Sequence, residues 1–72
     1  MDRSSRAPQA LPRLTPRERD VMRWVSEGKT DWATAQILGC KEGTVKKHLQ
    51  HIYRKLGVDN RTSAANCVRE LE

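Results

Sequence analysis

Apolar residues recur at the spacing of amphipathic helices from Leu14 onward. In the first periodic segment the apolar stripe consists of Val21, Met22 and Val25. Thr15 is predicted to cap this helix, with Pro16 at the first helical position and Glu18 placed to bond back to the cap amide. Gly28 is expected to end the helix, because glycine readily adopts the left-handed conformation that follows many helices.

Two further helices are predicted in the middle of the chain. The first is short, runs from about Asp31 to Leu38, and has Thr30 as its cap. Its apolar positions are Trp32, Ala35, Ile37 and Leu38. After a short connection, a longer helix is predicted from Glu42 to Leu56. Its apolar residues are Val45, Leu49, Ile52 and Leu56. Steps of four, three and four residues place this second set on one side of a helix.

The last helix is predicted from about Arg61 to Glu70. Gly57 ends the preceding helix, and Asp59-Asn60 offers a new cap. The buried stripe of the last helix is expected to be Ala64, Val68 and Leu71. Residues 1–13 are polar and contain two of the three prolines, so we expect a flexible tail or a linker there. Residues 14–72 are then one domain, an all-α, compact four-helix helix-turn-helix fold.

Composition narrows the class of protein further. The chain has 72 residues, only 4% of which are aromatic, which suits a few short helices better than a sandwich or barrel. No apolar run approaches the roughly 18 residues of a membrane span, and there is no secretion signal. We therefore expect a cytoplasmic domain that binds no membrane, with Cys40 and Cys67 as free thiols.

The chain has a net charge of +5, and several of its positive side chains lie on the third predicted helix. A basic balance alone fits nucleic acid, an acidic protein or an anionic lipid. On a helical wheel, however, the side chains between about 100° and 200° from the apolar stripe are polar and mostly cationic. They are Lys46, Lys47, Gln50 and Arg54. Together with the short helix and turn before it, this arrangement predicts a helix-turn-helix that reads the DNA major groove.

Helix starts supply candidate contacts to the DNA backbone, because free amides and hydroxyl groups there can hold a phosphate. Thr44 lies in the first turn of the third helix. Lys29 and Thr30 lie at the entry to the second helix, and Arg61 and Thr62 open the fourth. All five are predicted to contact phosphates.

Several separated stretches resemble the LuxR/GerE helix-turn-helix family, also called FixJ/NarL. They are Leu14-Thr15-Pro16-Arg17-Glu18-Arg19-Asp20-Val21-Met22, Glu27-Gly28-Lys29-Thr30, Thr44-Val45-Lys46-Lys47-His48-Leu49 and Arg54-Lys55-Leu56-Gly57-Val58-Asp59-Asn60-Arg61-Thr62. The resemblance runs from Leu14 to about Val68 in one register without gaps. The stretch from Gly28 to Trp32 is most similar to the quorum-sensing branch.

The resemblance implies a bacterial transcription regulator that binds double-stranded DNA. Carried over by position, the base-contacting residues are Lys46, Lys47 and Gln50, and Thr44 and Lys46 lie near the DNA backbone. The resemblance also makes Arg54 a backbone contact and gives His48 a role in packing and backbone contact. It also implies a homodimer that packs through the fourth helix. The expected interface residues are Ser63, Asn66, Cys67 and Glu70. Sensor functions in this family belong to an upstream domain, so this segment is expected to bind no small molecule.

Four positions depart from the family pattern. Ala33 and Thr34 stand where the family usually has glutamate and isoleucine, which removes a capping-box partner and some apolar burial. Lys41 replaces a serine cap, at a cost of about 1 kcal/mol. Gly43 adds up to about 1 kcal/mol relative to alanine in a helix. These changes predict a weaker start to the third helix and leave its basic face intact.

Rival functions have less support in the sequence. The thiols and imidazoles are Cys40, His48, His51 and Cys67, and they are too scattered for a zinc site or a cysteine nucleophile. We therefore predict no catalytic residue, no metal and no cofactor. A sigma-factor region-four domain shares a similar helix-turn-helix but fits the Gly57–Thr62 join less well. A protein-interaction module that binds an acidic partner, or sequesters another regulator, stays open.

Overall fold

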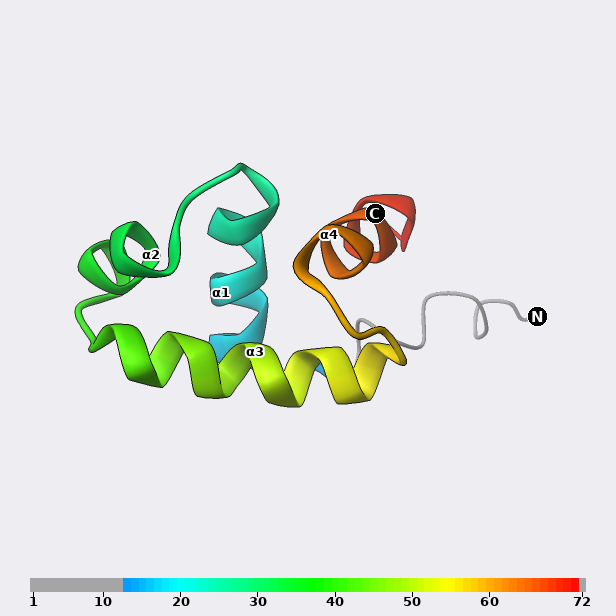
Figure 1. Ribbon diagram of the computed structural model, residues 1–72, viewed down its shortest axis with the longest axis horizontal. Coiled ribbons are helices and arrows are strands. Elements are labelled where there is room, and N and C mark those ends of the chain that lie inside the picture. Colours follow the sequence, from blue (N-terminus) through cyan, green and yellow to red (C-terminus); the bar gives the residue numbers. More distant parts are fainter. Residues whose placement is uncertain (1–12, 72) are drawn as a thin grey trace.

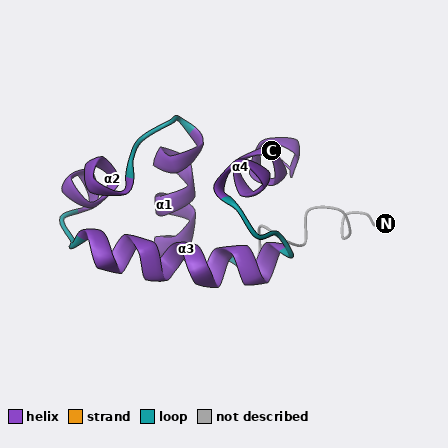
Figure 2. Cartoon of the chain, in the orientation of Figure 1, coloured by secondary structure: helices purple, strands orange, loops and turns teal. Residues whose placement is uncertain are grey.

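The computed structural model describes residues 13–71. Within that range it contains four helices and no strand (Figures 1 and 2). They are α1 (Pro16–Ser26), α2 (Asp31–Leu38), α3 (Glu42–Leu56) and α4 (Arg61–Leu71). The all-α prediction is confirmed, and the helix bounds agree with the sequence to within one or two residues. Residues 1–12 of the expected tail lie outside the described residues.

The helix α3 extends along one side of the molecule, and the other three helices pack against its inner side. In Figure 1, α2 lies over the amino-terminal end of α3, α4 lies over its carboxyl-terminal end, and α1 stands between them. The helix α1 contacts all three of the others. One long helix is thus supported by three shorter ones, and its outer side carries no packing partner within residues 13–71.

Local capping explains where the helices begin and end. Thr15 Oγ1 accepts a hydrogen bond from the Glu18 amide at 3.1 Å, and Glu18 Oε1 accepts one from the Thr15 amide at 2.9 Å. This is the predicted capping box. Thr30 Oγ1 caps α2 by accepting from the Ala33 amide at 3.0 Å, without a reciprocal bond from an alanine side chain. Lys41 gives α3 no side-chain cap, as its chemistry predicts.

The core is aliphatic and continuous across the four helices. Its buried members are Leu14, Val21, Met22, Val25, Ala35, Val45, Leu49, Ile52, Ala64 and Val68. The predicted stripe of α3 is confirmed for its first three residues, while Leu56 is half-buried. Leu71, expected on the stripe of α4, has a side chain outside the described part of the chain.

Two apolar positions of α2 do not lie in the core. Trp32 is 61% exposed and Ile37 is 46% exposed, although the sequence places both among the apolar positions of this helix. The side of α2 that faces the core carries Thr34, Ala35 and Leu38. Leu38 follows the other two at the helical spacing of four and three residues. Both large apolar residues fall off that stripe. Trp24 in α1 is half-buried.

Candidate nucleic-acid interface

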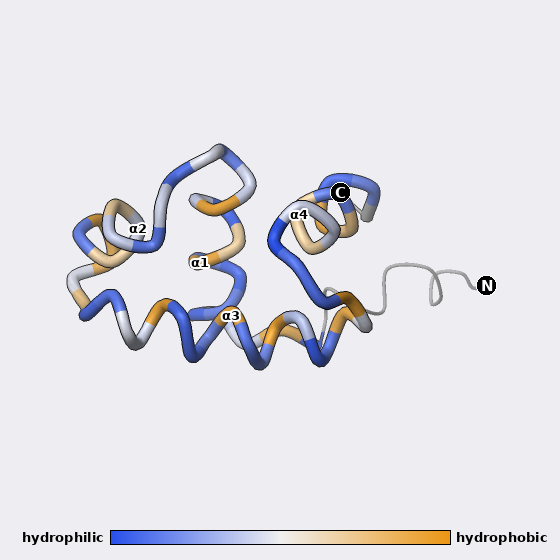
Figure 3. Tube along the Cα trace, viewed as in Figure 1, coloured by the Kyte–Doolittle hydropathy of each residue, from blue (hydrophilic) through white to orange (hydrophobic). Residues whose placement is uncertain are grey.

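The outer side of α3 is a continuous polar edge. Lys46, Lys47, Gln50 and Arg54 are all exposed, whereas Val45, Leu49 and Ile52 on the same helix are buried. Figure 3 shows hydrophilic residues along the side of α3 that is turned away from the other helices. Long donors on this side can reach a ligand without disturbing the core, which is the arrangement that groove reading needs. We call these four residues the basic edge.

The basic edge is little neutralised by neighbouring acids. Lys46 Nζ lies 3.9 Å from Glu42 Oε2, one helical turn earlier, and both side chains are about half exposed. An exposed pair at this distance contributes little, because water screens it. The charge of Lys46 therefore remains available to an anionic partner.

A buried carboxylate fixes α1 to the carboxyl-terminal half of α3. Lys55 Nζ donates to Glu18 Oε1 at 2.7 Å and to the Arg13 carbonyl at 3.2 Å. Burial raises the pKa of Glu18, but the hydrogen bonds from Lys55 and the Thr15 amide, with the charges of Lys55 and His48, outweigh it and leave the pKa lowered. Glu18 is therefore ionised at neutral pH, and its ion pair with Lys55 links α1 to α3.

A hollow of about 430 Å³ lies beside the amino-terminal end of the basic edge. It is lined by Gly28, Lys29, Thr30, Asp31, Glu42, Lys46 and Arg61. Four of the predicted contact residues, Lys29, Thr30, Lys46 and Arg61, therefore come together, although they belong to three different regions of the chain. The side chains of Lys29 and Thr30 are exposed there.

Arg61 differs from the other residues of that hollow because its guanidinium already has protein partners. Its Nη1 donates to Asp31 Oδ1 at 2.6 Å and its Nη2 donates to the Lys29 carbonyl at 2.7 Å. Sequence reasoning predicted a phosphate contact here and missed these bonds, since the partners lie about thirty residues away. The sequence signal was an acid at the start of α2 and an arginine at the start of α4.

The remaining predicted contacts are spread over two helices. Thr44 is exposed in the first turn of α3, and Thr62 is exposed in the first turn of α4. Of the four proposed interface residues on α4, Asn66 and Glu70 are exposed, while Ser63 and Cys67 are half-buried. Their roles in DNA contact and in dimer formation stay predictions.

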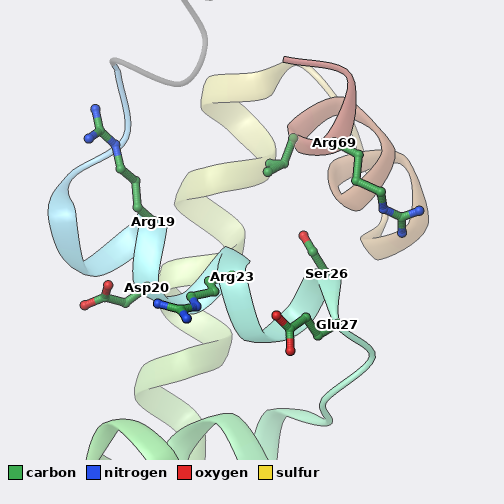
Figure 4. Close-up of a pocket in the computed structure, with 7 residues that line it drawn as sticks. Arg19, Asp20, Arg23, Ser26, Glu27 and Arg69 are labelled. Atoms are coloured by element: carbon green, nitrogen blue, oxygen red, sulfur yellow. The ribbon is translucent and has the colours of Figure 1, made fainter. Parts of the chain in front are cut away.

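A second hollow, of about 540 Å³, lies between α1 and α4, away from the basic edge (Figure 4). It is lined by Arg19, Asp20, Arg23, Ser26, Glu27, Val68 and Arg69. Two acids stand among three arginines, so this surface has mixed charge. The Arg23 guanidinium lies over the Trp24 ring, 5.1 Å from its centre, within the range of a cation–π contact. This hollow thus shows less charge bias than the basic edge.

The described residues contain neither a metal-binding cluster nor a membrane-spanning helix. Between residues 13 and 71, no three of the His, Cys, Asp and Glu side chains gather closely enough to hold a metal ion. The same residues include no helix with the length and apolar character needed to cross a bilayer.

The four-helix arrangement and its exposed basic edge define a helix-turn-helix domain of the kind that transcription regulators use to bind DNA. Within that class the chain belongs to the luxR family. The family described as "Bacterial regulatory proteins, luxR family" matches residues 12–68. This membership replaces the sigma-factor alternative.

Similar proteins carry regulator names. The chain is 47% identical over 57 residues to the transcriptional activator protein BjaR1 of Bradyrhizobium diazoefficiens, covering 79% of this chain and 24% of that protein. It is 50% identical over 52 residues to the quorum sensing-dependent transcriptional regulator RpaR of Rhodopseudomonas palustris, covering 72% and 21%. For the transcriptional activator protein LuxR of Aliivibrio fischeri, the figures are 43% over 63 residues, covering 75% and 25%. The chain spans about a quarter of the length of these relatives.

Proposed function

We propose that this domain binds a specific sequence of double-stranded DNA by inserting α3 into the major groove. The observation that carries the proposal is the basic edge, which lies opposite the buried stripe of the same helix. A helix of 15 residues is about 22 Å long and about 10–12 Å wide with its side chains, which suits a groove about 12 Å wide. The regulator names of the relatives support the same function.

Within this proposal the exposed residues divide into two roles. Lys46, Lys47 and Gln50 contact base edges, since they lie in the amino-terminal two-thirds of α3, the part that recognition helices insert deepest. The remaining contacts go to phosphates and set the register of the domain on the duplex. They are Lys29, Thr30, Thr44, Arg54 and Thr62, with Arg61 treated separately below. Lys46 also lines the hollow with Lys29 and Thr30, so we propose that it contacts a phosphate as well as a base edge.

We further propose that two copies bind together through α4. The exposed and half-buried residues Ser63, Asn66, Cys67 and Glu70 supply a surface on the side of α4 that the core does not use. In the longer relatives this domain is a small part of the protein, and we propose that signal reception belongs to another part of a complete regulator.

The test separates base reading from backbone contact. A high-affinity duplex is first selected from a random pool with the 72-residue chain, and its affinity is compared with that of a mixed-sequence duplex over a salt series. Lys47→Ala is expected to weaken binding to the selected duplex by about tenfold and to the mixed duplex by less, since a base contact is worth about 1–3 kcal/mol. An equal loss on both duplexes would move Lys47 to the backbone class.

Lys46→Ala is the matched comparison, because Lys46 lies next to Lys47 and borders the hollow. We expect this variant to bind both duplexes less tightly and to show a smaller salt slope, by about 0.9, for one lost phosphate contact. The unchanged chain could instead bind neither duplex and bind an acidic protein with an affinity that falls as the salt concentration rises. That result would favour a protein-interaction module over a DNA-binding domain.

A further inference from the structure

Arg61 ties the start of α4 to the start of α2. Its two terminal nitrogens bond to Asp31 Oδ1 and to the Lys29 carbonyl at 2.6 and 2.7 Å, so the guanidinium holds two points that flank Thr30. The Asp31 side chain is 18% exposed and the Arg61 side chain 38% exposed, which makes this pair better shielded than the Glu42–Lys46 pair. The planar fork of arginine suits such a two-point contact, and lysine lacks it.

The two points belong to the segment that carries the proposed phosphate contacts. The Lys29 carbonyl is one partner, and the side chain of Lys29 is exposed in the same hollow. Thr30 lies between these two points and caps α2. The two bonds of Arg61 therefore also hold the free amides of the first turn of that helix in place. Arg61 itself begins α4, the helix proposed to form the dimer.

We infer that Arg61 is a positioning residue for DNA binding, one that holds Lys29 and the amino terminus of α2 toward a phosphate and makes no phosphate contact of its own. This inference rests on the proposed DNA-binding function and refines the role of one residue within it. It also links the proposed dimer helix to the backbone contacts, because one side chain on α4 sets the conformation of the segment between α1 and α2.

Removal of the Asp31 carboxylate changes DNA affinity in opposite directions under the two possible roles of this residue. A carboxylate on a DNA-facing surface repels phosphates, so its removal would by charge alone strengthen DNA binding. If the carboxylate is needed to hold Arg61 and the Lys29 segment, its removal weakens DNA binding instead. The direction of the change therefore separates a positioning role from a purely electrostatic one.

The experiment measures the affinity of the 72-residue chain for a mixed-sequence duplex of about 20 base pairs, long enough for two turns of DNA, over a salt series. Asp31→Asn is expected to bind at least about fivefold more weakly than the unchanged chain, a typical coupling between two sites. The salt slope should fall by about 0.9, because Lys29 is no longer held at its phosphate. Asp20→Asn is the control: it makes the same charge change on α1, away from the hollow, and should leave the slope unchanged.

Two more variants test the positioning role directly. Lys29→Ala alone should weaken DNA binding. Added to Asp31→Asn, the same substitution should have little further effect. Arg61→Lys keeps the charge and loses the fork, so it should behave like Asp31→Asn. All variants are compared at a temperature at which circular dichroism shows each to be folded, so a change in slope cannot come from unfolding.

The outcomes are distinct. Weaker binding by Asp31→Asn together with the lost effect of Lys29→Ala supports the inference. Equal or tighter binding by Asp31→Asn, or an Arg61→Lys variant that binds as well as the unchanged chain, overturns it and returns Arg61 to direct phosphate contact. Failure of the unchanged chain to bind any duplex overturns the proposed function, and the inference with it.

Discussion

Thr34 is completely buried, yet its hydroxyl oxygen has no hydrogen-bond partner among the described residues. A buried hydroxyl without a partner destabilises a fold by about 1–3 kcal/mol. Valine has nearly the same shape without the hydroxyl. Thr34→Val is therefore expected to raise the free energy of unfolding by about 1 kcal/mol, measured by urea denaturation.

The control for this prediction lies four residues earlier. Thr30→Val removes a hydroxyl that does work as a cap, so the same substitution should lower stability by about 1 kcal/mol. If Thr34→Val proved as destabilising as Thr30→Val, the hydroxyl of Thr34 would have a partner that the structure does not show.

Among the described residues, Glu18 gives a dependence of stability on pH that can be tested. Its pKa is lowered in the folded chain, against the effect of burial, by Lys55 and by the Thr15 amide. The stability that comes from this pair is complete above the pKa of an unfolded glutamate, about 4.3, and is lost as the pH falls through the folded value. Glu18→Gln should therefore cost about 2 kcal/mol at pH 7, and the difference in stability between the two proteins should shrink as the pH falls below about 4.3.

Thermal unfolding between pH 7 and pH 3 measures this convergence. Glu27→Gln is the matched control, because Glu27 is exposed at the end of the same helix. A constant difference between Glu18→Gln and the unchanged chain over the whole pH range would show that the pair contributes no pH-dependent stability.

At the scale of the element, α3 is well packed along its length but poorly capped at its amino terminus. Its buried stripe and its left-handed Gly57 cap follow ordinary helix rules, but Lys41 offers no cap and Gly43 sits in the first turn. A methyl group added at Gly43 would meet nothing within 4 Å. Gly43→Ala is thus expected to stabilise the domain by about 0.5–1 kcal/mol in chemical denaturation.

The same substitution at Gly57 should have the opposite sign. Gly57 has a φ of +73°, a conformation that side chains rarely adopt, although there too the space around it is open. Gly57→Ala is expected to destabilise the domain. If both variants shifted stability in the same direction, backbone conformation would not be the deciding effect at these positions.

Much of the fold could be predicted from sequence because its signals are local. Thr15, Thr30 and Gly57 act within a few residues of their own positions, and the stripe of α3 repeats within one helix. The contacts that escaped prediction join distant residues: Lys55 with Glu18, and Arg61 with Asp31. The exposure of Trp32 escaped too, since hydrophobicity alone does not say which side of a short helix meets the core.

At the scale of the whole molecule, the proposed dimer makes a geometric prediction. If two copies join through α4 with two-fold symmetry, their α3 helices should enter the major groove about 34 Å apart, or about 10 base pairs. Sedimentation with a palindromic duplex of that spacing should then show two chains per duplex. Glu70→Lys, on the proposed interface, should make the two chains bind independently, so that more duplexes carry a single chain at a protein concentration that just fills both half-sites with the unchanged chain.

Inserting five base pairs between the half-sites supplies the control, because it turns one half-site to the opposite side of the duplex. The two chains should then bind independently. Binding of one chain per duplex at every spacing, even with protein in excess, would contradict a dimer through α4.

The arrangement of α3 also bears on how such domains diverge. Lys46, Lys47 and Gln50 share a helix with Val45, Leu49 and Ile52, yet the two sets face opposite directions and have no packing role in common. Mutations on the outer side are therefore close to neutral for folding, while mutations on the inner side are not. Under the proposed mode of binding, lineages that inherit this scaffold can acquire new target preferences by single substitutions, without a compensating change in the core.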